Sequence, residues 1–162
     1  MAVDLELIKN STDVNGPDFQ KHLLEQYKLY VEMADRISAR RMLANSFFVG
    51  VHTAFIAAFT VLIKEKILDQ TFFGMAPFIA VLILCLLWWL LINSYRQLNT
   101  GKFKVIHEFE KWLPAAPYDA EWKVLEEGKN RKAYWPFTHI ENYIPVCFAL
   151  LYIFLAVGLY FK

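Results

Sequence analysis

The sequence predicts an all-α membrane protein with three transmembrane helices, on the basis of its composition, its uncharged runs and the distribution of its basic residues. Of the 162 residues, 57% are hydrophobic and 17% are aromatic, whereas soluble domains are about half apolar. No Asp, Glu, Lys or Arg occurs in residues 42–63, 72–95 and 143–161. Each run is close to or above the ~20 residues that a helix needs to cross a bilayer core. Because a helix satisfies its own backbone polar groups in lipid, we expect three spanning helices.

The basic residues predict the orientation of these helices. They are concentrated before the first run and between the second and third runs, whereas the turn at 64–71 contributes only Lys64 and Lys66. Cytoplasmic loops carry an excess of Lys and Arg. We therefore expect the N-terminus and the segment 96–139 in the cytoplasm, and the C-terminus outside.

The first half of the chain predicts one long helix. Residues 1–16 are expected to form a flexible N-terminus, and Pro17 is typical of a first helical turn. A cytoplasmic helix is expected at 17–41 and transmembrane helix 1 at 42–63. No Gly or Pro interrupts residues 18–49, so the two are expected to be continuous. An outer turn at 64–71 and transmembrane helix 2 at 72–95 follow.

The segment 96–139 is expected to be a helical cytoplasmic loop. A separate helix is predicted from Lys102 to Leu113, ended by Pro114, and a short helix from 120 to 127, ended by Gly128. Residues 138–141, Thr-His-Ile-Glu, have the spacing of a capping box. They would open transmembrane helix 3, at 140–161.

The first span carries a polar stripe that is the strongest candidate for a functional site. At 100° per residue, five polar side chains fall within about a third of the helix circumference: Arg41, Asn45, His52, Thr53 and Thr60. Such a stripe either makes hydrogen bonds to other helices or lines a pore formed by several copies. His52 is either a neutral, hydrogen-bonded ring or a proton-sensitive gate. A lone three-span chain is expected to self-associate in order to shelter these groups.

Other classes of function have little support in the sequence. The net charge of +1 gives no reason to expect direct nucleic-acid binding, and no metal-ligand spacing or catalytic motif is present, so we expect no cofactor and no enzyme. Two arrangements remain open: a membrane pore, or a non-conducting scaffold that binds a cytoplasmic partner. A membrane-tethered nuclease using His107 or His139 is a weaker third hypothesis.

Several motifs in and around the cytoplasmic loop resemble the RipA family of small bacterial inner-membrane proteins. The resemblance rests mainly on the run Ile-Asn-Ser-Tyr-Arg-Gln-Leu-Asn-Thr-Gly-Lys-Phe-Lys-Val-Ile-His-Glu at 92–108. It also rests on Leu-Pro-Ala-Ala-Pro-Tyr-Asp at 113–119, Glu-Trp at 121–122 and Pro-Phe-Thr-His-Ile-Glu at 136–141. Tyr-Lys-Leu-Tyr at 27–30 and Asn-Ser-Phe-Phe at 45–48 are also similar to that family. The motif residues singled out are Asn93, Tyr95, Arg96, Asn99, Gly101, Lys102, His107, Trp122 and His139.

This resemblance implies a homo-octamer in the bacterial inner membrane, surrounded by lipid. The family is similar, more distantly, to membrane proteins encoded beside type VI-B CRISPR effectors, which form pores and support antiphage defence by depolarising the host membrane. A cytoplasmic defence partner that senses nucleic acid would then control the pore. No Arg is followed by His after four to six residues, so the ribonuclease motif discussed for those relatives is not matched.

Overall fold

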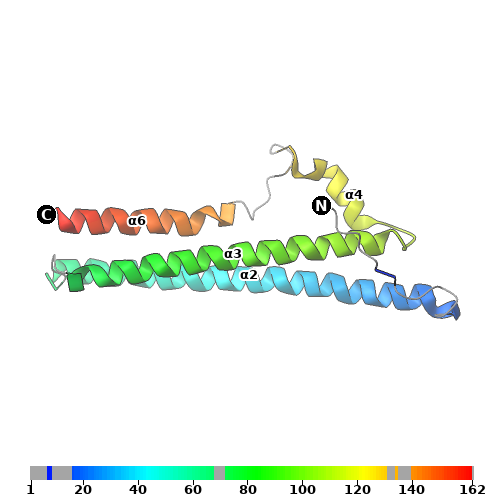
Figure 1. Cartoon of the computed structure of the whole chain (residues 1–162), viewed down its shortest axis with the longest axis horizontal. Coiled ribbons are helices and arrows are strands. Elements are labelled where there is room, and N and C mark those ends of the chain that lie inside the picture. Colours follow the sequence, from blue (N-terminus) through cyan, green and yellow to red (C-terminus); the bar gives the residue numbers. More distant parts are fainter. Residues whose placement is uncertain (1–6, 9–15, 68–71, 131–133, 135–139, 162) are drawn as a thin grey trace. The chain divides into compact units, whose positions relative to one another are not determined.

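In the computed structural model, residues 7–8, 16–67, 72–130, 134 and 140–161 are described, and all of their regular secondary structure is helical. The α-helices of these residues, labelled in Figure 1, are α2 (Phe19–Lys64), α3 (Phe72–Glu110), α4 (Pro117–Val124) and α6 (Tyr143–Tyr160). Short 3-10 turns occur at Gly16–Asp18 and Glu126–Gly128. Among the described residues, three helices are long and apolar enough to cross a membrane. The predicted fold class is confirmed.

The long helix α2 is a single element of 46 residues, or ~69 Å at ~1.5 Å per residue. It begins after the turn that contains Pro17, and no helix-breaking residue occurs until Gly50. A Cβ built at Gly50 would meet nothing within 4 Å, so this glycine is not required by close packing. The expected continuity of the first span with the preceding polar helix is confirmed.

Helix α3 differs from the sequence prediction at its C-terminal part. The separate helix expected from Lys102 to Leu113 does not exist as such, because α3 runs without a break from Phe72 to Glu110. Gly101 does not interrupt the helix, because a glycine lowers the stability of a helix by only about 1 kcal/mol relative to Ala. Gly101 is helical in the structure. The helix ends three residues earlier than predicted, consistent with the bias that Pro114 imposes on the chain just before it.

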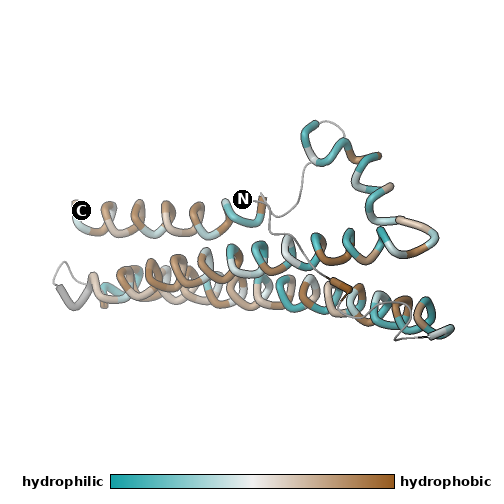
Figure 2. Tube along the Cα trace, turned by 45° about the vertical axis from the view of Figure 1, so that its right-hand side comes forward, coloured by the Kyte–Doolittle hydropathy of each residue, from teal (hydrophilic) through white to brown (hydrophobic). Residues whose placement is uncertain are grey.

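The chain divides into two compact units. The polar unit comprises residues 1–39 and 95–136, and the spanning unit comprises residues 40–94 and 137–162. Figure 2 shows the difference in chemistry: the tube is predominantly brown in the spanning stretches of α2, α3 and α6, and mixed teal and brown elsewhere.

Each unit has its own apolar core. The spanning unit buries Phe59, Phe78, Val81, Cys85, Tyr152 and Ala156. The polar unit buries Phe19, Leu23 and Phe109, with Tyr27, Tyr30, Val105 and Leu113 packed against them. The apolar and aromatic residues of the N-terminal part of α2 therefore pack on α3 within the same chain.

The segment after α4 contains a backbone position that favours glycine. Gly128 has a φ of +70°, a left-handed conformation that costs a residue with a Cβ roughly 1–2 kcal/mol. We expect Gly128→Ala to loosen the end of the 3-10 turn and to make the polar unit more sensitive to limited proteolysis, without affecting the spans.

Gly101→Ala is the matched control for this change. Gly101 is helical, and a Cβ there meets nothing within 4 Å, so this substitution should leave protease resistance unchanged or raise it. Equal sensitivity of the two variants would contradict the prediction.

Candidate functional site

The spanning unit contains a buried polar network centred on Asn45. Its side-chain Nδ2 donates to Glu141 Oε1 at 3.0 Å, and its Oδ1 accepts a hydrogen bond from Trp88 Nε1 at 3.0 Å. Asn45 lies in α2, Trp88 lies in α3 and Glu141 lies two residues before the start of α6. One amide thus links three segments and satisfies the only hydrogen-bonding group of the buried Trp88 ring.

Arg41 supplies the charge that balances Glu141. The Arg41 Nε lies 3.3 Å from Glu141 Oε2, and the two side chains are 13% and 2% exposed. Neither of these two atoms has a hydrogen-bond partner among the described residues, so the contact is an ion pair without good hydrogen-bond geometry. The Glu141 carboxylate contacts Asn45 and Arg41, and the capping box predicted at 138–141 stays a prediction. The other end of that box, residues 138 and 139, lies outside the described residues.

His52 lies deep in the spanning unit and is fully buried. Its Nδ1 is 3.0 Å from the Tyr152 hydroxyl, which itself donates to the His52 carbonyl at 3.1 Å. Because the Tyr152 proton is used there, the imidazole proton is assigned to Nδ1, and Nε2 is left to accept from the Cys85 thiol at 3.8 Å. The ring stacks on Trp88 and Phe148. His52 therefore acts as a hydrogen-bonded core residue within its own chain.

The predicted polar stripe is divided by the fold into two parts. Thr53 and Thr60 are exposed, and their hydroxyls donate to the carbonyls of Val49 and Ile56 in the same helix, both at 2.8 Å. His52 and Thr53 are separated by 100° around α2, which places one inside and the other outside the unit. The expected interhelical hydrogen bonds are found for Asn45 and His52, whereas the threonines remain on the free face.

The motif residues on which the resemblance to the RipA family rests do not form one site. In the spanning unit, Asn93 donates to the Trp89 carbonyl and accepts a long bond of 3.5 Å from Asn142. In the polar unit, Lys102 is buried, with its ammonium 4.3 Å from the centre of the Tyr30 ring. The remaining described motif residues are placed as follows: Tyr95, Arg96, Asn99 and His107 are half-buried, and Gly101 and Trp122 are exposed. His139 lies outside the described residues.

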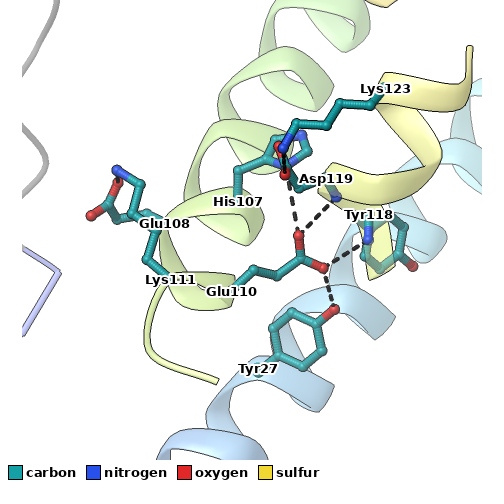
Figure 3. Close-up of polar contacts among 8 residues, drawn as sticks. All are labelled: Tyr27, His107, Glu108, Glu110, Lys111, Tyr118, Asp119 and Lys123. Atoms are coloured by element: carbon teal, nitrogen blue, oxygen red, sulfur yellow. Dashed lines mark hydrogen bonds and ion pairs between the residues drawn. The ribbon is translucent and has the colours of Figure 1, made fainter. Parts of the chain in front are cut away.

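Sequence reasoning missed a second polar centre, the buried carboxylate of Glu110 at the end of α3. Figure 3 shows it between α2 and the start of α4. Oε1 accepts hydrogen bonds from the Tyr27 hydroxyl at 3.0 Å and from the Tyr118 amide at 2.8 Å, and Oε2 accepts from the Asp119 amide at 2.9 Å. The carboxylate thus caps α4 from outside the helix.

The sequence contained a signal for this external cap. Ala116 occupies the N-cap position of α4 and makes no side-chain cap, whereas Ser, Thr, Asp or Asn is usual there. A negative charge at this end is also favoured by the helix dipole. Burial and the bond to Glu110 raise the pKa of Tyr27 above its ordinary value, which keeps the hydroxyl protonated as a donor. His107, whose Nδ1 lies 3.7 Å from Glu110 Oε2, borders the same carboxylate.

Neither polar centre has the composition of a metal site. Within the described ranges, no three His, Cys, Asp or Glu side chains lie close enough together to hold an ion. Both centres connect helices by hydrogen bonds and ion pairing, and their chemistry is structural and electrostatic.

We expect Glu110→Ala to release α4. The amides of Tyr118 and Asp119 would lose their acceptor, and an eight-residue helix has little stability of its own, so amide hydrogen exchange of residues 118–124 should become much faster. Glu108→Ala is the control, because Glu108 pairs with Lys111 at the surface. Unchanged protection of α4 in the Glu110 variant would contradict this role.

We also expect Glu141→Ala to destabilise the spanning unit strongly. It leaves the Arg41 charge buried without its partner, which typically costs about 3–5 kcal/mol, and it would lower the thermal unfolding temperature of the purified protein in detergent. Replacing both residues, as Arg41→Met with Glu141→Leu, should recover much of the loss. The exposed pair Glu127–Lys129 provides a control in Lys129→Met, worth at most about 1 kcal/mol. A double variant no more stable than the single one would argue against charge pairing.

Comparison with known proteins identifies the family. The family described as "Octameric membrane protein family (8xMP)" matches residues 24–161, which include both polar centres and the described parts of all three spans. Neither the curated proteins nor the solved structures contain a match. Because the matched region covers most of the sequence, the chain belongs to the octameric membrane protein family.

Proposed function

We propose that eight copies of this chain form a pore across the membrane. Every copy has the same asymmetric distribution of basic residues, which favours insertion of all copies in the same direction. A two-fold axis in the membrane plane would invert half of the copies. Eight equivalent copies with one orientation therefore form a cyclic ring around an axis perpendicular to the bilayer.

The match to an octameric family is the single observation that carries the proposal, because eight copies set the size of such a ring. Neighbouring helices pack at interaxial distances of ~8–10 Å, so eight helices side by side have their axes on a circle of ~10–13 Å radius. Subtracting a helix radius of ~5 Å, side chains included, leaves a central opening about 11–16 Å across. Side chains of the lining helices cannot fill this opening, so it contains either water or lipid.

The exposed surface of the spanning unit favours water, with α2 toward the axis. Its exposed small and hydroxyl-bearing residues recur at spacings of three and four: Ser46, Gly50, Thr53, Ala57 and Thr60. On the other two spans most of the exposed residues are large and apolar, and suited to lipid: Ile79, Ile83, Leu86, Leu87 and Leu90 on α3, and Leu150, Leu151, Ile153, Phe154 and Val157 on α6. The threonine oxygens keep an acceptor site for water after bonding to their own helix.

The proposed setting is the bacterial inner membrane, with the polar unit in the cytoplasm and the C-terminus outside. The basic-residue distribution supports this orientation, and the resemblance to the RipA family supports the membrane. A pore there would dissipate the membrane potential, as an effector of antiphage defence or stress. A cytoplasmic partner, such as a nucleic-acid-sensing defence protein, would supply the trigger through the polar unit.

A non-conducting scaffold is the second candidate. It is favoured by exposed aromatic residues in the polar unit, Trp112 and Trp122, which offer a surface to a cytoplasmic partner. In that case lipid would fill the axis. The two candidates differ in whether water reaches the exposed face of α2.

Cysteine accessibility tests this difference. In a Cys147→Ala background, which removes the exposed native thiol, we expect Thr53→Cys and Ala57→Cys to react with a charged, membrane-impermeant methanethiosulfonate reagent. The reaction should reduce the ionic current through the reconstituted octamer, because each modified copy adds bulk and charge to the water-filled path.

The controls are Ile83→Cys and Leu150→Cys, on the exposed faces of α3 and α6. Their thiols would lie in lipid, where they remain protonated and unreactive, so the current should not change. Reaction at the controls but not at α2 would place a different helix at the axis. An octamer that conducts no ions at all would favour the scaffold.

A further inference from the structure

Helix α4 is poorly covered for a helix of its length. None of its eight residues is buried, and isolated helices of this length are not stable in water. Its N-terminal end is held by the Glu110 carboxylate and by the Tyr118 ring, which contacts Phe103 with 5.7 Å between ring centres. Toward its C-terminal end, Val124 is 79% exposed. The distal part of α4 thus lacks a packing partner among the described residues of the chain.

The free side of α4 is apolar and has helical spacing. Pro117, Ala120 and Val124 are all exposed and follow one another after three and four residues, so they form a single ridge. Glu121 borders this ridge and makes no ion pair within the described part of the chain. The ridge belongs to the polar unit and lies far in sequence from the uncharged runs. It therefore does not have the setting of a lipid-facing surface.

A complementary ridge occurs on α2 in the same unit. Leu29 and Met33 are 58% and 42% exposed, and as residues four apart they lie side by side. Arg36, whose partner Glu32 is itself solvent-exposed, lies near the same side of the helix. Each chain thus has a short apolar ridge on α4 next to the acidic Glu121, and a second apolar ridge on α2 next to the basic Arg36.

A cyclic assembly requires two such faces. In a ring, each copy contacts its two neighbours through different surfaces, because the contact is heterologous. The family to which the chain belongs is octameric, so a second copy is the available occupant. We propose that the Pro117–Ala120–Val124 ridge of α4 docks on the Leu29–Met33 ridge of α2 in the neighbouring copy, with Glu121 near Arg36. This contact needs the octamer but does not require that it conduct.

Site-directed cross-linking tests the contact in the intact octamer. In the Cys147→Ala background, a chain carrying both Val124→Cys and Met33→Cys should, with a short bismaleimide, give a ladder of products up to eight chains on a denaturing gel. Each single-cysteine variant should give no ladder, because like residues do not meet across a heterologous contact. Val124→Cys with Lys28→Cys is the matched control, since Lys28 lies about 100° away from Leu29 on α2.

Thiol labelling tests the same contact without depending on the length of the cross-linker. Val124→Cys, and independently Ala120→Cys, should be protected from a hydrophilic maleimide in the octamer, whereas Lys129→Cys on the exposed turn should react fully. Free labelling of both α4 cysteines in an octamer of normal size would overturn the proposal. So would cross-linking confined to a single chain, or protection that is lost when residues 1–15 are deleted, since the chain itself would then cover α4.

Discussion

The spanning unit depends on one constraint, which is that polar groups inside a bilayer must find partners within the protein. Asn45 meets it most clearly, since its amide donates to Glu141 and accepts from Trp88, and the Arg41 guanidinium offsets the carboxylate. The loss of any member leaves a buried donor, acceptor or charge unpaired, which costs far more than the intact contact contributes. These polar contacts specify how the three spans meet, whereas apolar packing alone discriminates weakly between helix arrangements in lipid.

Two carboxylates at helix junctions have comparable roles in the two units. Glu141 precedes α6 and joins it to α2, and Glu110 ends α3, caps α4 and accepts a bond from Tyr27 on α2. Both are nearly inaccessible, at 1% and 3% exposure. An acceptor-only group with two oxygens suits a junction, because it can bind donors from two different segments at once.

The spans were predictable because a helix that crosses a bilayer needs about 20 uncharged residues, and the sequence itself shows both the length and the lack of charge. The division of the polar stripe could not be predicted from the sequence. His52 and Thr53 are adjacent residues, and only tertiary packing decides that one is buried and the other exposed. The role of Glu110 was also hidden, because a long-range cap depends on how the chain returns after Pro114. The unusual Ala116 at the N-cap was visible in the sequence, but it indicates only that a partner is missing, and not which residue supplies it.

The internal pairing of polar groups changes the reason for assembly. A lone three-span chain was expected to self-associate to shelter its intramembrane polar residues, yet Asn45, His52 and Glu141 find their partners within one chain. The threonines that remain exposed are satisfied by their own helix. Contacts between copies of this chain therefore draw on other surfaces. The small-residue face of α2 allows close approach of helices or of water, and the uncovered ridge of α4 offers apolar area outside the uncharged runs. Contacts between copies through such surfaces leave the Arg41–Glu141 pair inside each chain, so these contacts can form or change without leaving a buried charge unpaired in lipid.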